Sequence, residues 1–307
     1  MFVTTATMVA MLLLYALPGF LLIKSKLIKA EGIPGFAKLL LYVCQPALTF
    51  YSFDKADFSS SVLLNMGVIF IISFGGQMGV LMLFYFILRK KSKENVSLRI
   101  FNISVILANC GFFGIPVAEK LFPERSDAAL YCMVFSFALN LISWTVVMAV
   151  VTRDKKYIRP RQVFLNPATV SFFAAFLLFA FSLKLPALLF DAVSVVGKFA
   201  TPLCMLILGM RLGATKWKVV FASPVQYLAV AIKQLAVPFA MLLLLWLLPV
   251  DDFIKQLSFV LFACPVASNV LNFAELCGEG QETAAGTVLL GTILSVVTMP
   301  LMMLLIS

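Results

Sequence analysis

Long apolar stretches separated by short basic loops are the feature that most constrains what this chain can fold into. Of its 307 residues, 62% are hydrophobic and only 12% are charged, and the mean hydropathy is +1.05. A soluble domain carries about 25% charged residues, so this chain lacks the side chains to cover a water-facing surface. The composition therefore predicts an α-helical protein that lies in a lipid bilayer.

Ten stretches are long enough to cross the membrane, because a helix spans the hydrocarbon core with about 20 apolar residues. They are residues 2–23, 35–53, 61–88, 99–121, 128–151, 166–185, 189–210, 221–249, 254–276 and 283–306. The first has no basic segment before it and no small-residue cleavage site, so we expect a retained helix rather than a signal peptide. The predicted fold class is an all-α membrane protein with ten transmembrane helices.

Lys and Arg are distributed unevenly between alternate loops. The loops after the first, third, fifth and seventh predicted helices each carry three or more, whereas the loops after even-numbered helices carry one or two. Because cytoplasmic loops are enriched in basic residues, the pattern predicts a multi-pass protein of the cell membrane with both termini on the non-cytoplasmic side. The net charge of +10 belongs to these loops, so we do not expect nucleic-acid binding.

The sequence contains few groups for catalysis or metal binding. It has no His, and its six Cys lie in or beside apolar stretches without a C-x-x-C pair. We interpret these cysteines as small packing residues and expect no metal, cofactor or disulfide. With no mid-membrane carboxylate and no nucleophile paired with a base, an enzyme is not expected.

The two halves of the chain are predicted to be inverted repeats, because a repeated unit of five helices must reverse its direction across the membrane. The repeats cover residues 1–151 and 166–307, with a cytoplasmic linker at 152–165. A shift of about 155 residues brings residues 107–124 over 262–279, and a shift of 156 aligns Pro46 with Pro202 and Gln77 with Lys233.

Helix-breaking residues occur at mid-length in the fourth and ninth predicted helices. The fourth contains Gly111, Gly114 and Pro116, and the ninth contains Pro265 followed by Ser268, Asn269 and Asn272. Paired interruptions at corresponding positions of two halves mark the binding site in many transporters, since half-helix N-termini there attract a carboxylate. The alternative is that these are ordinary kinks of membrane helices.

Four motifs resemble the auxin efflux carrier family, whose bacterial members include proposed malate and malonate carriers. They are FAKLLLYVCQPALTFYSF (36–53), LANCGFFGIPV (107–117), MLILGMRL (205–212) and PVASNVLNFAELCGEGQETAAGTVLLGTILSVVTMP (265–300). The resemblance implies inverted repeats related in fold to bile-acid sodium symporters. Helices 1, 2, 6 and 7 would form a scaffold, often a homodimer, and helices 3–5 and 8–10 a transport domain with helices 4 and 9 crossing at its centre.

The same resemblance implies that Asn109 hydrogen-bonds the substrate carboxylate. Plant members place Pro directly before this Asn, whereas this chain has Ala108, so Gly111 and Gly114 would have to permit the unwinding and the geometry around Asn109 stays open. The predicted substrate-binding residues are Asn109, Cys110, Gly111, Gly114, Pro116, Pro265, Ser268, Asn269, Lys233 and Gln77.

Several polar residues within the predicted spans have two interpretations. Lys233 is either a counter-charge for the anion or a stem that reaches the membrane interface, and Lys198 is a second candidate cation. Gln77 is either a site residue or a helix–helix contact, the interpretation that we favour for Asn140. Ser268, Asn269 and Asn272 would complete a substrate cage or ligate Na⁺.

Together these patterns predict a secondary carrier of small organic anions, a mono- or dicarboxylate, that works by elevator-type alternating access. Its partners would be the carboxylate, the lipid bilayer and a second copy of the chain. Because the sequence has no ATP-binding motif, uniport, antiport and symport remain open. The alternative function is a ligand-sensing membrane receptor on a carrier fold.

Overall fold

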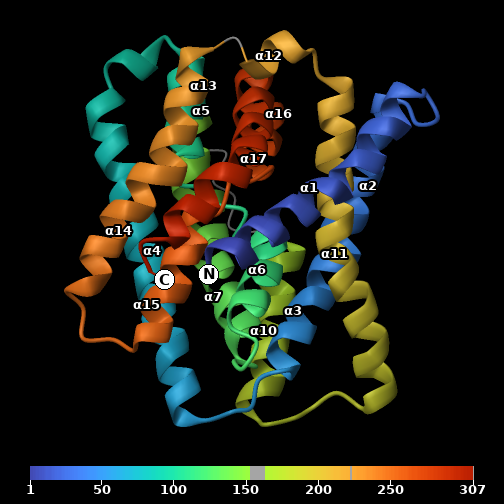
Figure 1. The fold of residues 1–307 in the computed structure, drawn as a ribbon, viewed down its shortest axis with the longest axis vertical. Helices are drawn as coiled ribbons and strands as arrows, with labels where there is room; N and C mark the ends of the chain where they lie inside the picture. The colour runs from blue at the N-terminus through green and yellow to red at the C-terminus, as the bar shows by residue number, and fades with distance from the viewer. Residues whose placement is uncertain (153–162, 222, 307) are drawn as a thin grey trace.

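A computed structural model describes residues 1–152, 163–221 and 223–306. In these ranges every regular element is helical (Figure 1). Four membrane-length helices are regular α-helix throughout: α1 (Phe2–Lys24), α4 (Ser60–Leu88), α11 (Ala187–Ala214) and α17 (Gln281–Met303). The predicted linker at 152–165 lies mostly outside the described residues.

Three further spans each contain one π-helical turn. They are α2, η2 and α3 (Ile33–Leu39, Leu40–Cys44 and Gln45–Asp54), α7, η5 and α8 (Ala128–Ile142, Ser143–Val147 and Met148–Thr152), and α13, η7 and α14 (Pro224–Ala231, Ile232–Ala236 and Val237–Trp246). Pro46 and Pro238 lie at the second position after η2 and η7. Because Pro has no N–H and clashes with the turn before it, the wider turn lets the helix continue past the ring.

Seven continuous segments of the described chain are long and apolar enough to cross a membrane, whereas ten spans were predicted. The sixth predicted span contains the shorter helix α10 (Pro167–Ala180). The fourth is divided into α5 (Val96–Ser104), the π-turn η4 (Cys110–Gly114) and α6 (Ile115–Leu121). The ninth is divided into α15 (Asp252–Ala263) and α16 (Asn269–Cys277). Neither interrupted segment is one long helix, so neither is among the seven continuous segments.

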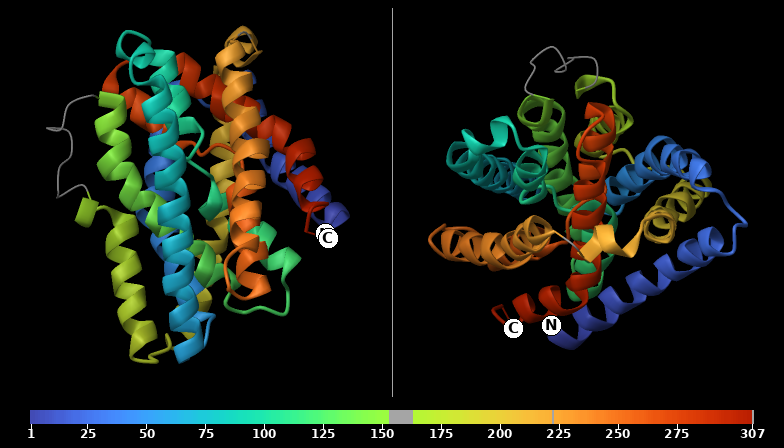
Figure 2. Two further views of the ribbon diagram at one scale, coloured as in Figure 1. Left: turned by 90° about the vertical axis from the view of Figure 1, so that its left-hand side faces the viewer. Right: turned by 90° about the horizontal axis from the view of Figure 1, so that it is seen from above.

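The helices pack in two groups, which are joined by packing of α1 on α17. In one, α1 lies along α11, and α11 and α10 both pack on α3 (Figures 1 and 2). In the other, α4 packs on α7, α14 on α15, and α13 and α16 on α17. Short elements complete the loops: η1 (Ala30–Gly32), η3 (Lys91–Lys93) and α12 (Trp217–Phe221). The loops that follow α1, α4 and α11 lie at the upper end in Figure 1, and those before α4, α11 and α15 at the lower end.

Glycines permit the close packing of α1 on α11. A Cβ at Gly209 would overlap the backbone carbonyl of Ala16, and a Cβ at Gly19 would overlap that of Leu206. Gly213, four residues after Gly209, also faces α1, near the backbone of Phe20. Such small-residue spacing lets membrane helices approach until their backbones touch, where van der Waals packing replaces the hydrophobic effect as the driving force.

We predict that Gly209→Ala lowers the free energy of unfolding by about 3 kcal/mol or more, because the new methyl group must displace the backbone of α1. Thermal unfolding of the detergent-solubilised protein measures this effect. The matched control is Gly79→Ala on α4, where an added Cβ meets nothing within 4 Å; its gain in helix propensity of about 1 kcal/mol should leave the melting temperature unchanged or higher. Equal melting temperatures for the two variants would contradict the prediction.

Candidate functional site

The two interrupted segments meet and hydrogen-bond to each other. After α5 the chain leaves the helix until η4, and after α15 it does so until α16. The Asn109 backbone N–H donates to the Pro265 carbonyl at 2.9 Å, and the Ala267 N–H donates to the Leu107 carbonyl at 2.8 Å. Ala108 and Val266 therefore face each other in a single antiparallel bridge. This pairing satisfies backbone groups that could not be left unpaired in lipid.

Local sequence explains where the helices stop and restart. Pro265 lacks an N–H and cannot extend α15. Beyond the bridge, the Asn109 carbonyl accepts from the N–H groups of Phe113 and Gly114, both at 3.1 Å, and so starts η4. A Cβ at Gly114 would lie 2.7 Å from Leu261 Cδ2, so a glycine there lets η4 pack closely against α15.

Lys233 caps the end of α15. It comes from the π-turn η7, is 1% exposed, and its Nζ donates to the Phe262 carbonyl at 2.7 Å. The last carbonyls of a helix have no partner within the helix and carry partial negative charge, so a buried ammonium is stabilised there. Lys233 thus lies at the interruption, near Cys110 and Cys264.

One face of α11 contacts both interrupted segments. Thr201 Oγ1 donates to the Phe112 carbonyl at 2.8 Å, and the Cys204 thiol lies close to the Asn109 side chain. Two turns further along, Arg211 Nη2 donates to Asn272 Oδ1 of α16 at 3.1 Å. These α11 positions are three and seven residues apart in sequence, so they lie on one face of the helix.

Arg211 is the polar residue at this site that sequence reasoning missed, because the basic count assigned it to a cytoplasmic loop. It lies inside α11, and its Nη1 is buried without a hydrogen-bond partner among the described residues. The spacing of Lys198, Thr201, Cys204 and Arg211 along one helical face is the signal that could have identified it.

A cavity of about 180 Å³ lies beside this face of α11, bounded also by α1, α3 and α6. It is lined by Tyr51, Pro116, Glu119, Lys198 and Thr201, among others. The Lys198 Nζ lies 5.0 Å from the centre of the Tyr51 ring. In the described part of the chain no carboxylate forms an ion pair with Lys198, so this cation is available to a ligand.

The one carboxylate of the cavity is already neutralised. Glu119 Oε1 accepts from Tyr51 Oη at 3.0 Å and from Lys55 Nζ at 2.7 Å. Burial alone lowers the pKa of Lys55, but the hydrogen bond and the charge of Glu119 reverse this effect and hold that pKa above its ordinary value. Lys55 therefore keeps its positive charge beside Glu119, and Lys198 gives the cavity its excess positive charge.

The remaining predicted site residues are placed differently. Gln77 Nε2 donates to Ser73 Oγ at 2.6 Å, and Ser73 donates to the Phe135 carbonyl at 2.9 Å, so this pair joins α4 to α7. Ser268 is half-buried and Asn269 is exposed at the start of α16. Of the ten predicted substrate-binding residues, Pro116 alone is among those that line the cavity beside α11. Asn140 donates to Thr169 Oγ1 at 3.2 Å, as a contact between helices.

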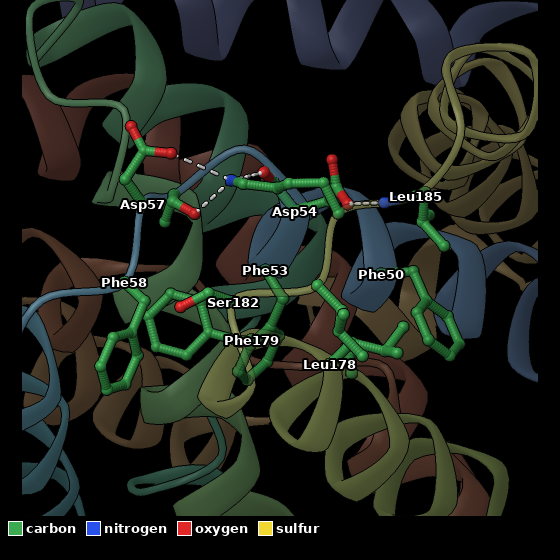
Figure 3. A pocket seen from close by; sticks show the side chains of 13 residues that line it. Phe50, Phe53, Asp54, Asp57, Phe58, Leu178, Phe179, Ser182 and Leu185 are labelled. Carbon is green, nitrogen blue, oxygen red and sulfur yellow. Dashed lines mark hydrogen bonds and ion pairs between the residues drawn. The ribbon is translucent and has the colours of Figure 1, made fainter.

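A second cavity, of about 250 Å³, lies at the lower end of the molecule, away from the interrupted segments (Figure 3). Phe58 and Phe179 line it with their rings 5.4 Å apart. Lys184 Nζ donates to the carbonyls of Asp54 and Ala56 at 2.5 and 2.7 Å, and the Leu185 N–H donates to Asp54 Oδ1 at 2.7 Å. This arrangement fastens the loop after α3 to the loop after α10, and we assign it a structural role.

The two glycines of the fourth span should differ in their tolerance of a side chain. We predict that Gly114→Ala lowers the free energy of unfolding by about 1–3 kcal/mol, because its Cβ must displace Leu261 and Cys264. Gly111→Ala is the matched control, since its Cβ would lie at an ordinary 3.5 Å from Ser136 Oγ. Thermal unfolding of the two variants side by side measures the difference, and a loss as large in Gly111→Ala would disprove the packing argument.

Comparison with known families accounts for this architecture. A family model described as a membrane transport protein matches residues 4–163 and 151–303, which together cover nearly the whole chain. No curated protein matches the chain. The resemblance seen in the four sequence motifs is thereby confirmed, together with an apolar, multi-pass helical structure and a transport rather than an enzymatic family. The chain belongs to the auxin efflux carrier family of membrane transporters.

Proposed function

We propose that this transporter is a secondary carrier of small organic anions, mono- or dicarboxylates, whose substrate binds where the two interrupted segments meet. The observation that carries the proposal is the mutual pairing of Asn109 with Pro265 and of Ala267 with Leu107. This pairing places the N-termini of two helices, η4 and α16, next to the point where the segments meet. The first N–H groups of each helix have no partner within that helix and carry partial positive charge, which suits a carboxylate.

Asn109 and Lys198 divide the recognition of the anion. The Asn109 side chain points to α11, where it meets Cys204, and its amide would donate to one carboxylate oxygen. The Lys198 ammonium supplies the opposite charge from the cavity next to Pro116 and Thr201. A cavity of about 180 Å³ is smaller than the roughly 300–1,000 Å³ of drug-sized sites, so the substrate is a short acid.

Transport follows from sliding of one group of helices along the other. The group of α1, α3, α10 and α11 is the scaffold, held by the glycine contacts of α1 and α11, and it forms the homodimer. The remaining helices carry the substrate, as two inverted repeats whose interrupted members cross at the centre. Lys198 and Arg211 lie thirteen residues apart on α11, about 20 Å along its axis. In this proposal one of these cations can bind the anion on each side of the crossing.

The membrane orientation follows from the charged loops. The upper end in Figure 1 bears the basic clusters after α1, α4 and α11, and basic residues favour the cytoplasm. We therefore place this end in the cytoplasm and both termini on the outer side of the cell membrane. In this orientation, Lys198 is nearer the outer face than Arg211.

Uptake into proteoliposomes tests the site. With a radiolabelled panel of short mono- and dicarboxylates, with and without a Na⁺ gradient, the wild type should accumulate at least one acid above protein-free liposomes. Asn109→Ala should weaken binding of that acid about tenfold to a hundredfold, because a hydrogen bond to a charged group contributes about 1.5–3 kcal/mol. The control is Asn140→Ala, which removes an amide that contacts Thr169 and should retain uptake. Unchanged uptake by a stable Asn109→Ala protein would refute the site.

The charge of Lys198 is tested separately. Lys198→Gln should raise the KM for the transported acid about tenfold, because it removes the only free cation lining the described cavity. Lys198→Arg, which keeps the charge, should restore part of the affinity. Lys38→Gln removes an exposed scaffold cation elsewhere and should leave KM unchanged. If Lys198→Gln transports with wild-type KM, or if uncharged amide analogues are carried as well as the acids, electrostatic recognition at this cavity is wrong.

A further inference from the structure

A large cavity with a basic rim lies at the upper end of the molecule and shares no lining residue with the cavity beside α11. It has a volume of about 690 Å³ and lies between the end of α4, the start of α5 and the region of η5 and α8. Its rim carries four cations, namely Arg89, Lys90, Lys93 and Arg99. Of the described residues that line it, none is acidic.

The positive charge of this cavity is only partly balanced. Arg99 Nη2 pairs with Glu279 at 2.9 Å and Arg99 Nη1 donates to the Val151 carbonyl at 2.9 Å, while its Nε is buried without a partner in the described chain. Arg89 and Lys90 form no ion pair with any described carboxylate. The cavity therefore offers at least two exposed cations and one unused buried donor to an anion.

The interior of the cavity differs chemically from its rim. Met82, Val146 and Val150 provide an apolar floor. The buried Asn102 also lines it, and its Oδ1 has no hydrogen-bond partner in the described ranges. Next to the cavity, α4 exposes the large apolar side chains Leu83, Phe86 and Ile87, which we assign to the lipid-facing surface of the span.

We propose that this cavity binds an anionic phospholipid, with the phosphate on the Arg89, Lys90 and Arg99 side chains and the upper part of an acyl chain against Met82 and Val150. Guanidinium and ammonium groups form charge-assisted hydrogen bonds to phosphate oxygens. A hydroxyl of the headgroup donates to Asn102 Oδ1. Basic pockets between helices at the cytoplasmic surface are suited to such headgroups.

The apolar floor favours a lipid over a soluble phosphate. A free anion would gain from the cations but would leave Met82, Val146 and Val150 against water. A lipid covers these side chains with hydrocarbon and keeps its headgroup at the level where α4 ends, which is the level of the membrane interface. The site lies on α4, α5 and α8, so a bound lipid would accompany the group of helices that we assign to substrate movement.

Native mass spectrometry of the full-length protein in detergent tests the proposal with phosphatidylglycerol and phosphatidylcholine as probes. The wild type should retain one phosphatidylglycerol in preference to phosphatidylcholine. The double variant Arg89→Gln/Lys90→Gln should bind phosphatidylglycerol at least about tenfold more weakly, since each cation near a headgroup contributes severalfold to affinity.

The matched control is Lys24→Gln/Lys29→Gln, which removes two exposed charges from the end of α1 and the loop after it, at the same end of the molecule. Lys24 lies 5.6 Å from the Phe20 ring centre and Arg89 lies 5.7 Å from that of Phe86, so the two variants lose similar local contacts. The control should bind phosphatidylglycerol like the wild type. Equal loss in both doubles, or equal binding of the two lipids by the wild type, would overturn the proposal.

A competition arm distinguishes lipid from free phosphate. Inorganic phosphate and glycerol phosphate, added at millimolar concentration, should fail to displace phosphatidylglycerol from the wild type. Displacement by either one would show that the cavity recognises a soluble phosphate, and the lipid assignment would then be wrong. The melting temperature of each variant without added lipid should match the wild type, so that weaker binding cannot be attributed to unfolding.

Discussion

The hydrogen bonds between the two interrupted segments are the constraint on which this structure depends. In hydrocarbon an unpaired backbone group costs several kcal/mol, so a chain that leaves its helix in mid-membrane must find partners from another segment. Here Asn109 bonds to Pro265 and Ala267 bonds to Leu107. Each interruption is therefore possible only because the other is present.

Much of this arrangement was predictable from residues whose chemistry acts locally. Pro265 cannot continue a helix, and glycine at 114 allows η4 to approach α15, so both interruptions could be located from the sequence. The basic loops identified alternate ends of the helices. The membrane-length apolar segments could also be predicted from the sequence. The helix α10 ends at Ala180, however, before the end of its predicted span at residue 185.

What the sequence could not supply was the direction of side chains across helix contacts. Lys233 was predicted either to face an anion or to reach the membrane interface, and the structure points its Nζ at the Phe262 carbonyl. Arg211 was counted with a loop, yet it reaches Asn272 from within α11. In both cases the position along the chain was known but the neighbour was not, because a partner on another helix is set by packing rather than by local periodicity.

The Lys184 contacts at the lower end limit how far α4 can lie from the loop after α3. Lys184 holds the Ala56 carbonyl, and α4 begins at Ser60, so only four chain steps join a fixed point to the first helix of the other group. An extended chain spans at most about 3.6 Å per residue, so the segment between Ala56 and Ser60 reaches at most about 14 Å. The start of α4 can therefore lie no farther than this from the Ala56 carbonyl group unless the Lys184 hydrogen bonds break.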